Sequence, residues 1–522
     1  MAPIKVIDLF AGPGGLGEGF TTFRTNAGLP CFDVVFSAER EASAHRTLTL
    51  RSLFRQYSDG GVPEAYYAFM RGELGKNPED ELYRLPEIQD GLNKAKQEAR
   101  QLELGKKGNH ASVYKEIRSA LKGEDFVLLG GPPCQAYSLV GRSRNQGEKG
   151  KIYDADQDHR NFLYVEYLRI IAKFQPLCFI MENVKGLLSA KTSAGPVFPR
   201  IMSDLADPGK SCSTKPDLGR SGHRYKIFSF VEEEVADLFG ETRTTLKPQD
   251  YIIQSELYGI PQARHRVILF GIREDLANAP PEQLKQSVIK STVHDAISDL
   301  PELRSGLSKE EDNIETWRAI RNGMPKALSN ASSQFQPKIT DIYEQTDLGN
   351  ASLGRGGEFE MRQKNLTGSL HSWYADPRLG MHITNHSTRG HIRGDLQRYW
   401  FAAAFCKAKG FSPKAQSFPE ELHPNHANFT SGNFADRFRV QRWGAPSTTV
   451  TSHISKDGHY FIHPDIAQMR SLTVREAARL QTFPDNYHFV GNRTDQYVQV
   501  GNAVPPLLAA QLAKVVASQL GR

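Results

Sequence analysis

The segment that decides the fold lies between residues 126 and 138 and reads FVLLGGPPCQAYS. Residues 126–129 form a short apolar run, and such a run bounded by turn residues indicates a buried strand. The run ends at Gly130-Gly131-Pro132-Pro133, because two prolines fix φ and remove two amide donors. Cys134 is therefore expected at the carboxyl end of a strand, which is the edge where open α/β sheets bind ligands.

A cysteine at such an edge is a candidate nucleophile. A thiol reacts as the thiolate, so its free pKa of about 8.5 must be lowered by positive charge or amide dipoles nearby. We therefore expect cationic partners for Cys134 elsewhere in the chain. The alternative is that Cys134 is a small buried hydrophobe, as many free cysteines are.

Length and composition describe a globular chain. Its 522 residues suffice for two domains, and its formal charge of +6 permits a polyanionic partner. The five cysteines are widely spaced and include no Cys-x-x-Cys pair, which favours a reducing compartment over disulfides or a zinc site. We find no signal peptide and no stretch of roughly 20 apolar residues. We therefore expect a cytoplasmic protein without a membrane span or a metal site.

The N-terminus has the pattern of a nucleotide-binding fold. An apolar strand at residues 4–10 leads into a glycine-rich turn at residues 11–20, and a second strand at residues 34–38 ends at Glu39. Glycines let the backbone approach a ligand closely, and a carboxylate at the end of the second strand can bind both ribose hydroxyls. Because Glu39 lies 22 residues after Gly17, the spacing alone also fits a nicotinamide dinucleotide enzyme.

Further polar groups follow other predicted strands. The apolar run at residues 178–181 ends at Glu182, where lost hydration favours the protonated carboxyl and hence proton donation. Arg264 and Arg266 alternate on a predicted strand, so both guanidinium groups are expected on one face. Two fixed cations there suit a thiolate and a phosphate.

Two basic stretches suggest contacts with a nucleic acid. Residues 139–160 contain Arg142 and Arg144 without a hydrophobic period; they are either a surface loop or a lid that closes over a phosphate backbone. Residues 351–450 carry thirteen Lys or Arg against seven acids, with interleaved tryptophans, a composition typical of nucleic-acid surfaces. Three histidines in this interval, His382, His386 and His391, are weak metal candidates because no cysteine or helix supports them.

Six blocks, taken in order, resemble the motifs of bacterial-type DNA cytosine-C5 methyltransferases: DLFAGPGG at 8–15, GGPPCQ at 130–135, ENV at 182–184, QARHR at 262–266, RSLTVREAARLQTFP at 470–484 and GNAVPP at 501–506. The resemblance implies an α/β, Rossmann-like fold of S-adenosylmethionine-dependent methyltransferases, with a mixed seven-stranded sheet. It also implies a catalytic domain at 1–273, a smaller target-recognition domain at 274–470, and a return of residues 471–522 to the catalytic domain.

The resemblance assigns roles to individual residues. Cys134 would add to C6 of a flipped-out cytosine while Glu182 holds N3 and the exocyclic amine, with Arg264 and Arg266 beside them. S-adenosylmethionine would contact Phe10, Ala11, Gly12, Gly14, Gly15, Glu39, Pro132, Asn502 and Val504. DNA would contact Gln135, Ser138, Arg142 and Arg144. The implied partner is double-stranded DNA, bound by a monomer that protects it from a cognate restriction endonuclease.

The chain departs from the family between residues 58 and 123, a charged insertion in which apolar residues at helical spacing predict one amphipathic helix over residues 92–102. The aspartate that would read the adenine is not evident, and Asp59 and Asp125 are poor candidates. An RNA (tRNA) cytosine methyltransferase could share every catalytic block, but the Cys-Phe-Thr signature of that branch is absent. A nicotinamide-dependent oxidoreductase would leave three of the motifs unexplained.

Overall fold

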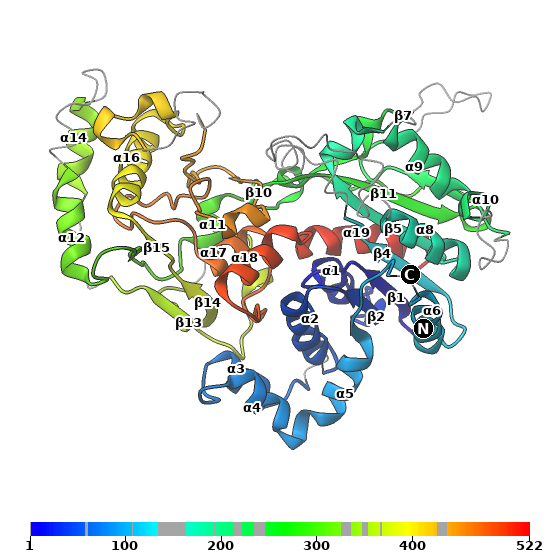
Figure 1. Cartoon of the computed structure of the whole chain (residues 1–522). Helices are drawn as coiled ribbons and strands as arrows, with labels where there is room; N and C mark the ends of the chain where they lie inside the picture. The colour runs from blue at the N-terminus through cyan, green and yellow to red at the C-terminus, as the bar shows by residue number, and fades with distance from the viewer. Residues whose placement is uncertain are drawn as a thin grey trace.

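The computed structural model describes residues 2–57, 61–106, 108–133, 163–192, 195–212, 222–233, 246–324, 336–346, 353–365, 368–424 and 436–522. Its main element is a large mixed sheet with helices on both faces, and most of residues 274–470 lie in a second body beside it (Figure 1). The C-terminal helices run back from this second body to the sheet. The predicted α/β class is confirmed.

The sheet has the strand order β3-β2-β1-β4-β5-β11-β8, with β9 also on β11. The strands are β1 (Ile4–Leu9), β2 (Phe32–Glu39), β3 (Ala99–Gln101), β4 (Phe126–Gly130), β5 (Cys178–Val184), β8 (Tyr225–Phe228), β9 (Ile252–Gln254) and β11 (His265–Arg273). The first five positions are parallel, and β11 is antiparallel to β5. The predicted seven positions are present, but the last holds two short strands, because β8 and β9 pair with opposite ends of β11.

The strand order places a switch point between β1 and β4. From β1 the chain crosses to β2 on one side, whereas from β4 it crosses to β5 on the other. Leu9 and Gly130 are register partners at the carboxyl ends of these two strands. The loops that follow β1 and β4 therefore diverge from neighbouring points, the arrangement that opens a ligand crevice in α/β sheets.

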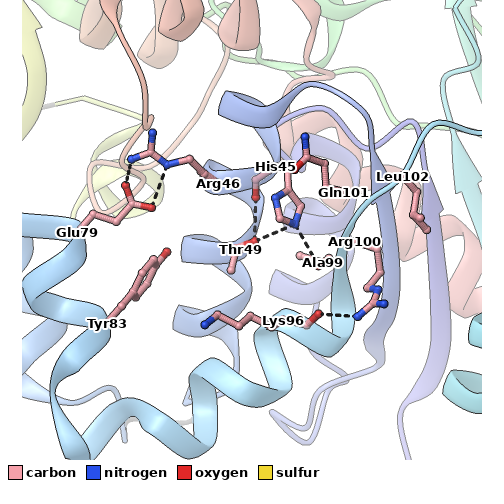
Figure 2. A pocket seen from close by; sticks show the side chains of 10 residues that line it. All are labelled: His45, Arg46, Thr49, Glu79, Tyr83, Lys96, Ala99, Arg100, Gln101 and Leu102. Carbon is pink, nitrogen blue, oxygen red and sulfur yellow. Dashed lines mark hydrogen bonds and ion pairs between the residues drawn. The ribbon is translucent and has the colours of Figure 1, made fainter.

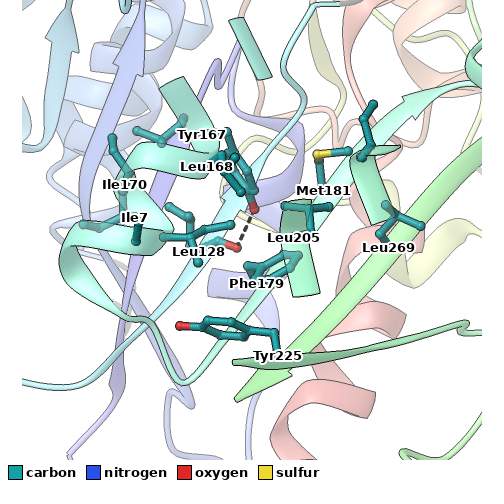
Figure 3. Close-up of a cluster of buried hydrophobic side chains, with 14 of the residues drawn as sticks. Ile7, Leu128, Tyr167, Leu168, Ile170, Phe179, Met181, Leu205, Tyr225 and Leu269 are labelled. Atoms are coloured by element: carbon teal, nitrogen blue, oxygen red, sulfur yellow. Dashed lines mark hydrogen bonds between the residues drawn. The ribbon is translucent and has the colours of Figure 1, made fainter. Parts of the chain in front are cut away.

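Alternating side chains build a core on each face of the sheet. Ile7 packs with Leu128 and Tyr167 under α6 (His110–Leu121), α8 (Leu163–Phe174) and α9 (Val197–Ala206) (Figure 3). The Tyr167 hydroxyl donates to the Leu128 carbonyl at 3.2 Å and so is satisfied within the apolar cluster. Val6 points to the other face, where α1 (Gly15–Thr22) and α19 (Pro506–Gln519) cover the sheet.

The insertion is helical, but not as predicted. After α2 (Ala42–Arg55) come α3 (Glu64–Met70), α4 (Pro78–Arg84), the short turn η1 (Pro86–Ile88) and α5 (Gln89–Glu98). The predicted helix over residues 92–102 is wrong at its end: α5 stops at Glu98, and the next three residues pair with β2 as β3. The apolar spacing continues across the boundary because Ala99 on β3 is also buried, at 2% exposed.

Residues 274–470 contribute one core around a long helix, but Ala277 and Leu284 pack with the sheet, and Val293 and Ile383 pack with residues 472–503. The elements of residues 274–470 are α11 (Val293–Ile297), β12 (Gly306–Leu307), α12 (Ile314–Asn322), α14 (Gln336–Gln345), β13 (Gly356–Met361), α15 (His371–Tyr374), β14 (His382–Ser387), β15 (Gly390–His391), α16 (Arg393–Lys409) and β16 (Ser447–Thr448). Helix α16 is buried on most sides, with Trp400 and Phe401 at its centre. Its apolar residues therefore lack the one-sided period that identifies surface helices.

The final segment joins both bodies. Helix α17 (Val474–Leu480) packs on α11 and β14, whereas α19 packs along α1. Thr473 caps α17 through a capping box with Glu476. Among the described residues one helical stretch, Arg493–Gln519, is long and apolar enough to cross a membrane, but 72% of its most apolar window is buried inside the protein. It comprises α18 (Arg493–Asn502) and α19, which serve as core helices.

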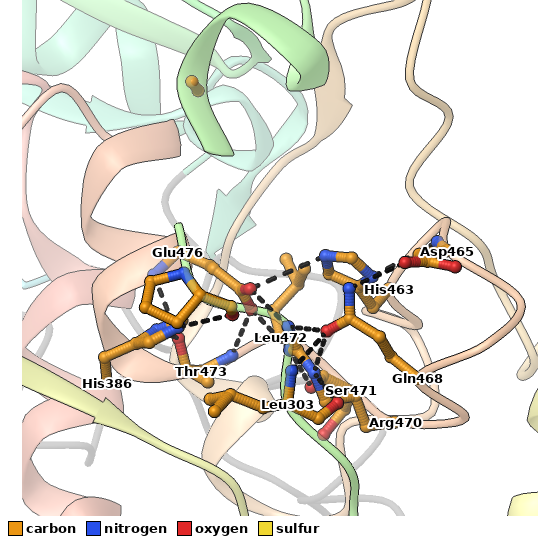
Figure 4. A network of polar contacts seen from close by, with 12 residues as sticks. Leu303, His386, His463, Asp465, Gln468, Arg470, Ser471, Leu472, Thr473 and Glu476 are labelled. Atoms are coloured by element: carbon orange, nitrogen blue, oxygen red, sulfur yellow. Dashed lines mark hydrogen bonds and ion pairs between the residues drawn. The ribbon is translucent and has the colours of Figure 1, made fainter. Parts of the chain in front are cut away.

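A buried ionic network sits where α17 begins (Figure 4). Arg470 donates two hydrogen bonds to Glu476, at 2.6 and 2.7 Å, and both side chains are 1% exposed. Although burial opposes ionisation, Arg470 and His463 hold the pKa of Glu476 below its ordinary value. Next to them the His386 ring contacts the Thr473 hydroxyl at 2.9 Å through Nδ1. The network ties β14 to the cap of α17.

This network predicts that acid destabilises the fold. Burial lowers the pKa of His386 to about 4, whereas an unfolded histidine titrates near 6.5. Between these values the unfolded chain holds more protons, so the free energy of unfolding falls as pH falls, by up to about 1.4 kcal/mol per pH unit from this residue. Urea unfolding at pH 7, 5.5 and 4.5 should show this decline, and His386→Gln should make it shallower. Equal slopes in both proteins would contradict the assignment.

Candidate functional site

The strand ends at the switch point bring the predicted motifs together. The Asn183 side chain on β5 donates to the Pro132 carbonyl at 3.1 Å, which holds the turn after β4 against the end of β5. Gly131 faces the Glu182 carboxylate, since a Cβ atom at Gly131 would lie 3.1 Å from Oε2. Cys134, Gln135, Ser138, Arg142 and Arg144 lie outside the described residues. The turn that precedes Cys134 thus adjoins Glu182.

Glu182 is paired with Arg266. The antiparallel register of β5 and β11 sets Val184 opposite Arg266 and Glu182 opposite Ile268, so the charged pair is diagonal on one face. Arg266 Nε lies 2.9 Å from Glu182 Oε1, with the two side chains 13% and 12% exposed. Burial lowers the pKa of Arg266, and the neighbouring Glu182 raises it in partial compensation. A carboxylate and a guanidinium are therefore held together at the edge of the crevice.

The Arg264 side chain does not lie at the crevice edge beside Arg266. It precedes β11, its side chain is 1% exposed, and its Nη1 donates to the carbonyls of Val450 and Gly501 at 2.9 and 3.2 Å. Burial, with the nearby Arg266 adding to it, lowers its pKa. The expectation that Arg264 would project beside Arg266 toward a phosphate therefore needs correction. The peptide turn between β10 (Gln262–Ala263) and β11 sends the Arg264 side chain inward.

Gln262 in the same motif joins three separate segments. Its Oε1 accepts from the Val450 amide at 2.7 Å, and its Nε2 donates to the Leu480 carbonyl at 3.1 Å and to Gln481 Oε1 at 3.0 Å. Gln481 in turn donates to the carbonyls of Val500 and Ala503. Sequence reasoning missed Gln481, because a glutamine next to a helix carries no signal of its own. The two glutamines connect the 262–266 motif with the C-terminal motifs.

The glycine loop after β1 forms a compact turn that is held by backbone hydrogen bonds. Phe10 and Gly12 have left-handed φ angles of 57° and 59°, and the Gly14 amide donates to the Ala11 carbonyl at 2.9 Å. The Ala11 amide donates to the Ala38 carbonyl at 3.1 Å, which ties the loop to the end of β2. Gly12 borders open space, since a Cβ atom there would meet nothing within 4 Å.

The Glu39 carboxylate is fixed against this loop. Oε2 accepts from the Gly12 amide at 2.8 Å, and Oε1 accepts from the amides of Arg40 and Glu41 at 2.8 and 2.7 Å. Burial raises the pKa of Glu39 above its ordinary value, and the three amides act against that rise. The loop and the carboxylate are therefore placed together, as their spacing predicted.

The end of β3 identifies a residue that sequence reasoning missed. Gln101 is the register partner of Glu39, and the Leu102 amide donates to the Glu39 carbonyl at 2.8 Å. Asp125 immediately precedes β4 and so lies at the opposite, amino edge of the sheet, which excludes it from the crevice. Asp59 lies outside the described residues. Gln101 escaped notice because β3 is too short to show a strand pattern.

The C-terminal segment closes against the glycine loop. A Cβ atom at Gly15 would lie 2.3 Å from the Val504 carbonyl, so only glycine permits this contact. The Tyr487 hydroxyl donates a short hydrogen bond to the Pro13 carbonyl. Val504 is 7% exposed, whereas Asn502 is exposed. Val504 and Tyr487 of the C-terminal segment therefore lie against the first loop.

Comparison with known proteins agrees with this arrangement. The family model of C-5 cytosine-specific DNA methylases matches residues 101–216 and 247–518. The chain belongs to this family. It is 32% identical to the type II methyltransferase M.Bpa9945I of Bacillus paralicheniformis over 98% of each chain, and 26% identical to the type II methyltransferase M.AgeI of Thalassovita gelatinovora over 98% of this chain and 99% of that one.

A solved structure gives the same fold. The crystal structure of a protein described as a prophage-encoded DNA modification methyltransferase (E. coli) aligns with 99% of this chain and 100% of its own, with a TM-score of 0.54 at 18% identity. The methylase family uses S-adenosylmethionine as methyl donor and DNA as substrate. The loop geometry fits that cofactor, because Gly12 leaves open space beside a fixed carboxylate that can accept from ribose hydroxyls.

A cavity of about 390 Å³ lies elsewhere in this methylase, between α2, α4 and β3 (Figure 2). Arg46 on α2 reaches across it to Glu79 on α4, and the Thr49 hydroxyl donates to the His45 carbonyl at 2.9 Å. The cavity contains none of the predicted catalytic residues. It touches the crevice edge only at Gln101, among the described residues that line it. The cavity lies between α2 and the helices of the insertion, and it is separate from the Glu182–Arg266 pair.

Proposed function

We propose that this methylase transfers a methyl group to C5 of cytosine within a specific short sequence of double-stranded DNA. The observation that supports the proposal most is the Glu182–Arg266 pair, held at 2.9 Å beside the Gly131 turn that leads to Cys134. A flipped-out base with its C6 near Cys134 would have its N3 edge toward Glu182. Base flipping is required because a stacked cytosine exposes neither atom to these side chains.

The chemistry follows from the poor nucleophilicity of C5. The Cys134 thiolate forms a bond to C6, and the electrons of the C5–C6 double bond shift toward N3, where Glu182 supplies a proton or a hydrogen bond. S-adenosylmethionine, when bound, would supply the electrophilic methyl group that C5 accepts, and the broken sulfur–methyl bond would leave S-adenosylhomocysteine. Loss of the C5 proton to a base restores the double bond and expels Cys134. Arg266 keeps the Glu182 carboxyl in place throughout.

The described residues suggest how the cofactor is held. Glu39 would accept hydrogen bonds from the ribose, and the loop from Phe10 to Gly15, with Pro132, Asn502 and Val504, would enclose the rest. Gln101 ends β3 beside Glu39, and its amide can both donate to and accept from an adenine edge. Arg264 and Gln262 would act as positioning residues, because their side chains bind protein groups.

Cofactor affinity provides a test of the Glu39 role. Glu39→Gln should weaken S-adenosylhomocysteine binding about tenfold to a hundredfold, since hydrogen bonds to charged groups contribute about 1.5–3 kcal/mol. Isothermal titration calorimetry measures this directly. Glu41→Gln is the matched control, because Glu41 is 61% exposed and pairs with Arg40; equal affinities for the two variants would count against the assignment.

The biological role is inferred from the relatives. Two type II methyltransferases match the chain almost end to end, so we place it in a bacterial cytoplasm, as a monomer that protects DNA from a cognate restriction endonuclease. We assign catalysis to residues 1–273, recognition to 274–470, and closure of the cofactor pocket to 471–522. Transfer of tritiated methyl groups from S-adenosylmethionine to unmethylated DNA, and not to tRNA, is the expected result; label in tRNA alone would move the assignment to RNA.

A further inference from the structure

We propose that α3 of the insertion is a positioning element that holds the 274–470 region at a fixed orientation to the sheet. The proposal rests on the proposed function, because this orientation matters for methylation only if the 274–470 region reads DNA. Helix α3 carries none of the predicted site residues, and it lies directly below β13 (Figure 1). Its contacts run to α4, to residues of the 274–470 region and to Asn486 and His488 of the C-terminal segment, rather than to the crevice.

Polar contacts join α3 to the loop before β14. The Asp376 carboxylate accepts from the Tyr67 hydroxyl at 2.9 Å and from the Asn486 side chain at 2.7 Å, both through Oδ2. Arg378 Nη1 donates to the Val62 carbonyl at 2.6 Å, and its guanidinium carbon lies 4.1 Å from the centre of the Tyr67 ring. Charge-assisted and cation–π contacts of this kind fix both distance and angle.

Apolar contacts extend the same interface. Phe359 on β13 packs edge-on against Phe69 of α3, with ring centres 6.0 Å apart, and stacks on His488 at 5.8 Å. Leu379 is 1% exposed and completes the hydrophobic cluster of the insertion, which otherwise consists mainly of α2, α3, α4 and α5 side chains. The core of the insertion is thus completed by a residue of the 274–470 region, so separating them would expose apolar surface.

This interface is an additional anchor. The 274–470 region is also held by the packing of α17 on α11 and β14 and by the pairing of β10 with β16, where the Ser447 amide donates to the Pro261 carbonyl at 2.9 Å. The β10–β16 pairing lies at the opposite side of the region from α3 (Figure 1). A body attached at one place can pivot, whereas two separated attachments set its angle. Since misplacement by about 1 Å can cost a hundredfold in rate, the α3 contacts should matter for DNA and not for the cofactor.

Two glycines of the insertion provide a matched test. Gly72 and Gly75 both have left-handed φ angles, 75° and 71°, so alanine strains both backbones alike. A Cβ atom at Gly72 would lie 2.7 Å from Phe359 Cγ, whereas at Gly75 it would meet nothing within 4 Å. Gly72→Ala should raise KM for DNA about tenfold or more and speed amide exchange in β13, with KM for S-adenosylmethionine unchanged. Gly75→Ala should match the wild type in KM for DNA, in KM for S-adenosylmethionine and in amide exchange in β13.

Equal KM values for DNA and equal exchange in the two variants would overturn the proposal. If Gly72→Ala fails to fold, Arg378→Gln takes its place, with Arg84→Gln as control because Arg84 pairs only with Glu81 among the described residues. The same contrast is then expected between these two variants, and its absence overturns the proposal. A wild type that methylates no DNA would reject the proposed function, and the exchange measurement would still decide the role of α3.

Discussion

Replacing Cys134 by alanine should abolish methyl transfer, with a fall in kcat of about four orders of magnitude or more, as when other covalent nucleophiles are removed. The bond to C6 cannot form without the thiolate, so C5 stays too electron-poor to accept a methyl group. Binding of S-adenosylhomocysteine should be retained, because Glu39 and the glycine loop bind independently of the thiol. Single-turnover transfer of labelled methyl groups to DNA measures the loss.

DNA that contains 5-fluorocytosine identifies the covalent step directly. Fluorine at C5 cannot leave as a cation, so the bond from Cys134 to C6 should persist and survive a denaturing gel. Cys134→Ala should form no such adduct. Cys31→Ala is the control, because Cys31 directly precedes β2 and so lies at the opposite edge of the sheet. An adduct in Cys134→Ala, or its loss in Cys31→Ala, would place the nucleophile elsewhere.

Glu182→Gln should lower kcat about a hundredfold to a thousandfold, with KM for S-adenosylmethionine unchanged. Glutamine keeps the shape of the side chain but cannot deliver a proton to N3, and it leaves the Arg266 guanidinium, 13% exposed, without its counterion. The comparison of interest is between kcat and cofactor KM. A fall in kcat accompanied by a similar rise in KM for S-adenosylmethionine would instead indicate that the substitution had disturbed the fold.

A neighbouring carboxylate provides the control for Glu182. Glu256 lies 2.8 Å from His265, the residue next to Arg266, and is 21% exposed. Because side chains alternate along β11, His265 points away from the face that carries Arg266. Glu256→Gln removes a partly buried carboxylate from the short turn Ser255–Tyr258 beside β11 and should leave kcat within about twofold, the scale of an exposed ion pair.

The strands that position the site could be predicted from the sequence because each is a continuous apolar run. β4 and β5 are buried on both faces, so their residues need no alternation, and the turn residues after β4 mark its end. β3 could not be predicted in this way. It has three residues, follows α5 without a turn, and gains its strand conformation by pairing with β2.

Contacts within the site depended on information that local sequence lacks. The pairing of Glu182 with Arg266 follows from the register between β5 and β11, which lie more than 80 residues apart. The burial of Arg264 depends on carbonyls supplied by Val450 and Gly501. The contacts of Tyr67 with Asp376 likewise cross between distant segments. A periodic pattern identifies an element, but only the packed fold determines its partners.

Bisulfite sequencing tests the central claim most directly. Unmethylated genomic DNA would be incubated with the protein and S-adenosylmethionine, treated with bisulfite and sequenced, since C5 methylation protects cytosine from conversion. Our account predicts protected cytosines confined to one short sequence, with none protected by the Cys134→Ala variant. Complete conversion by an active preparation that binds the cofactor, or protection at cytosines without regard to sequence, would contradict it.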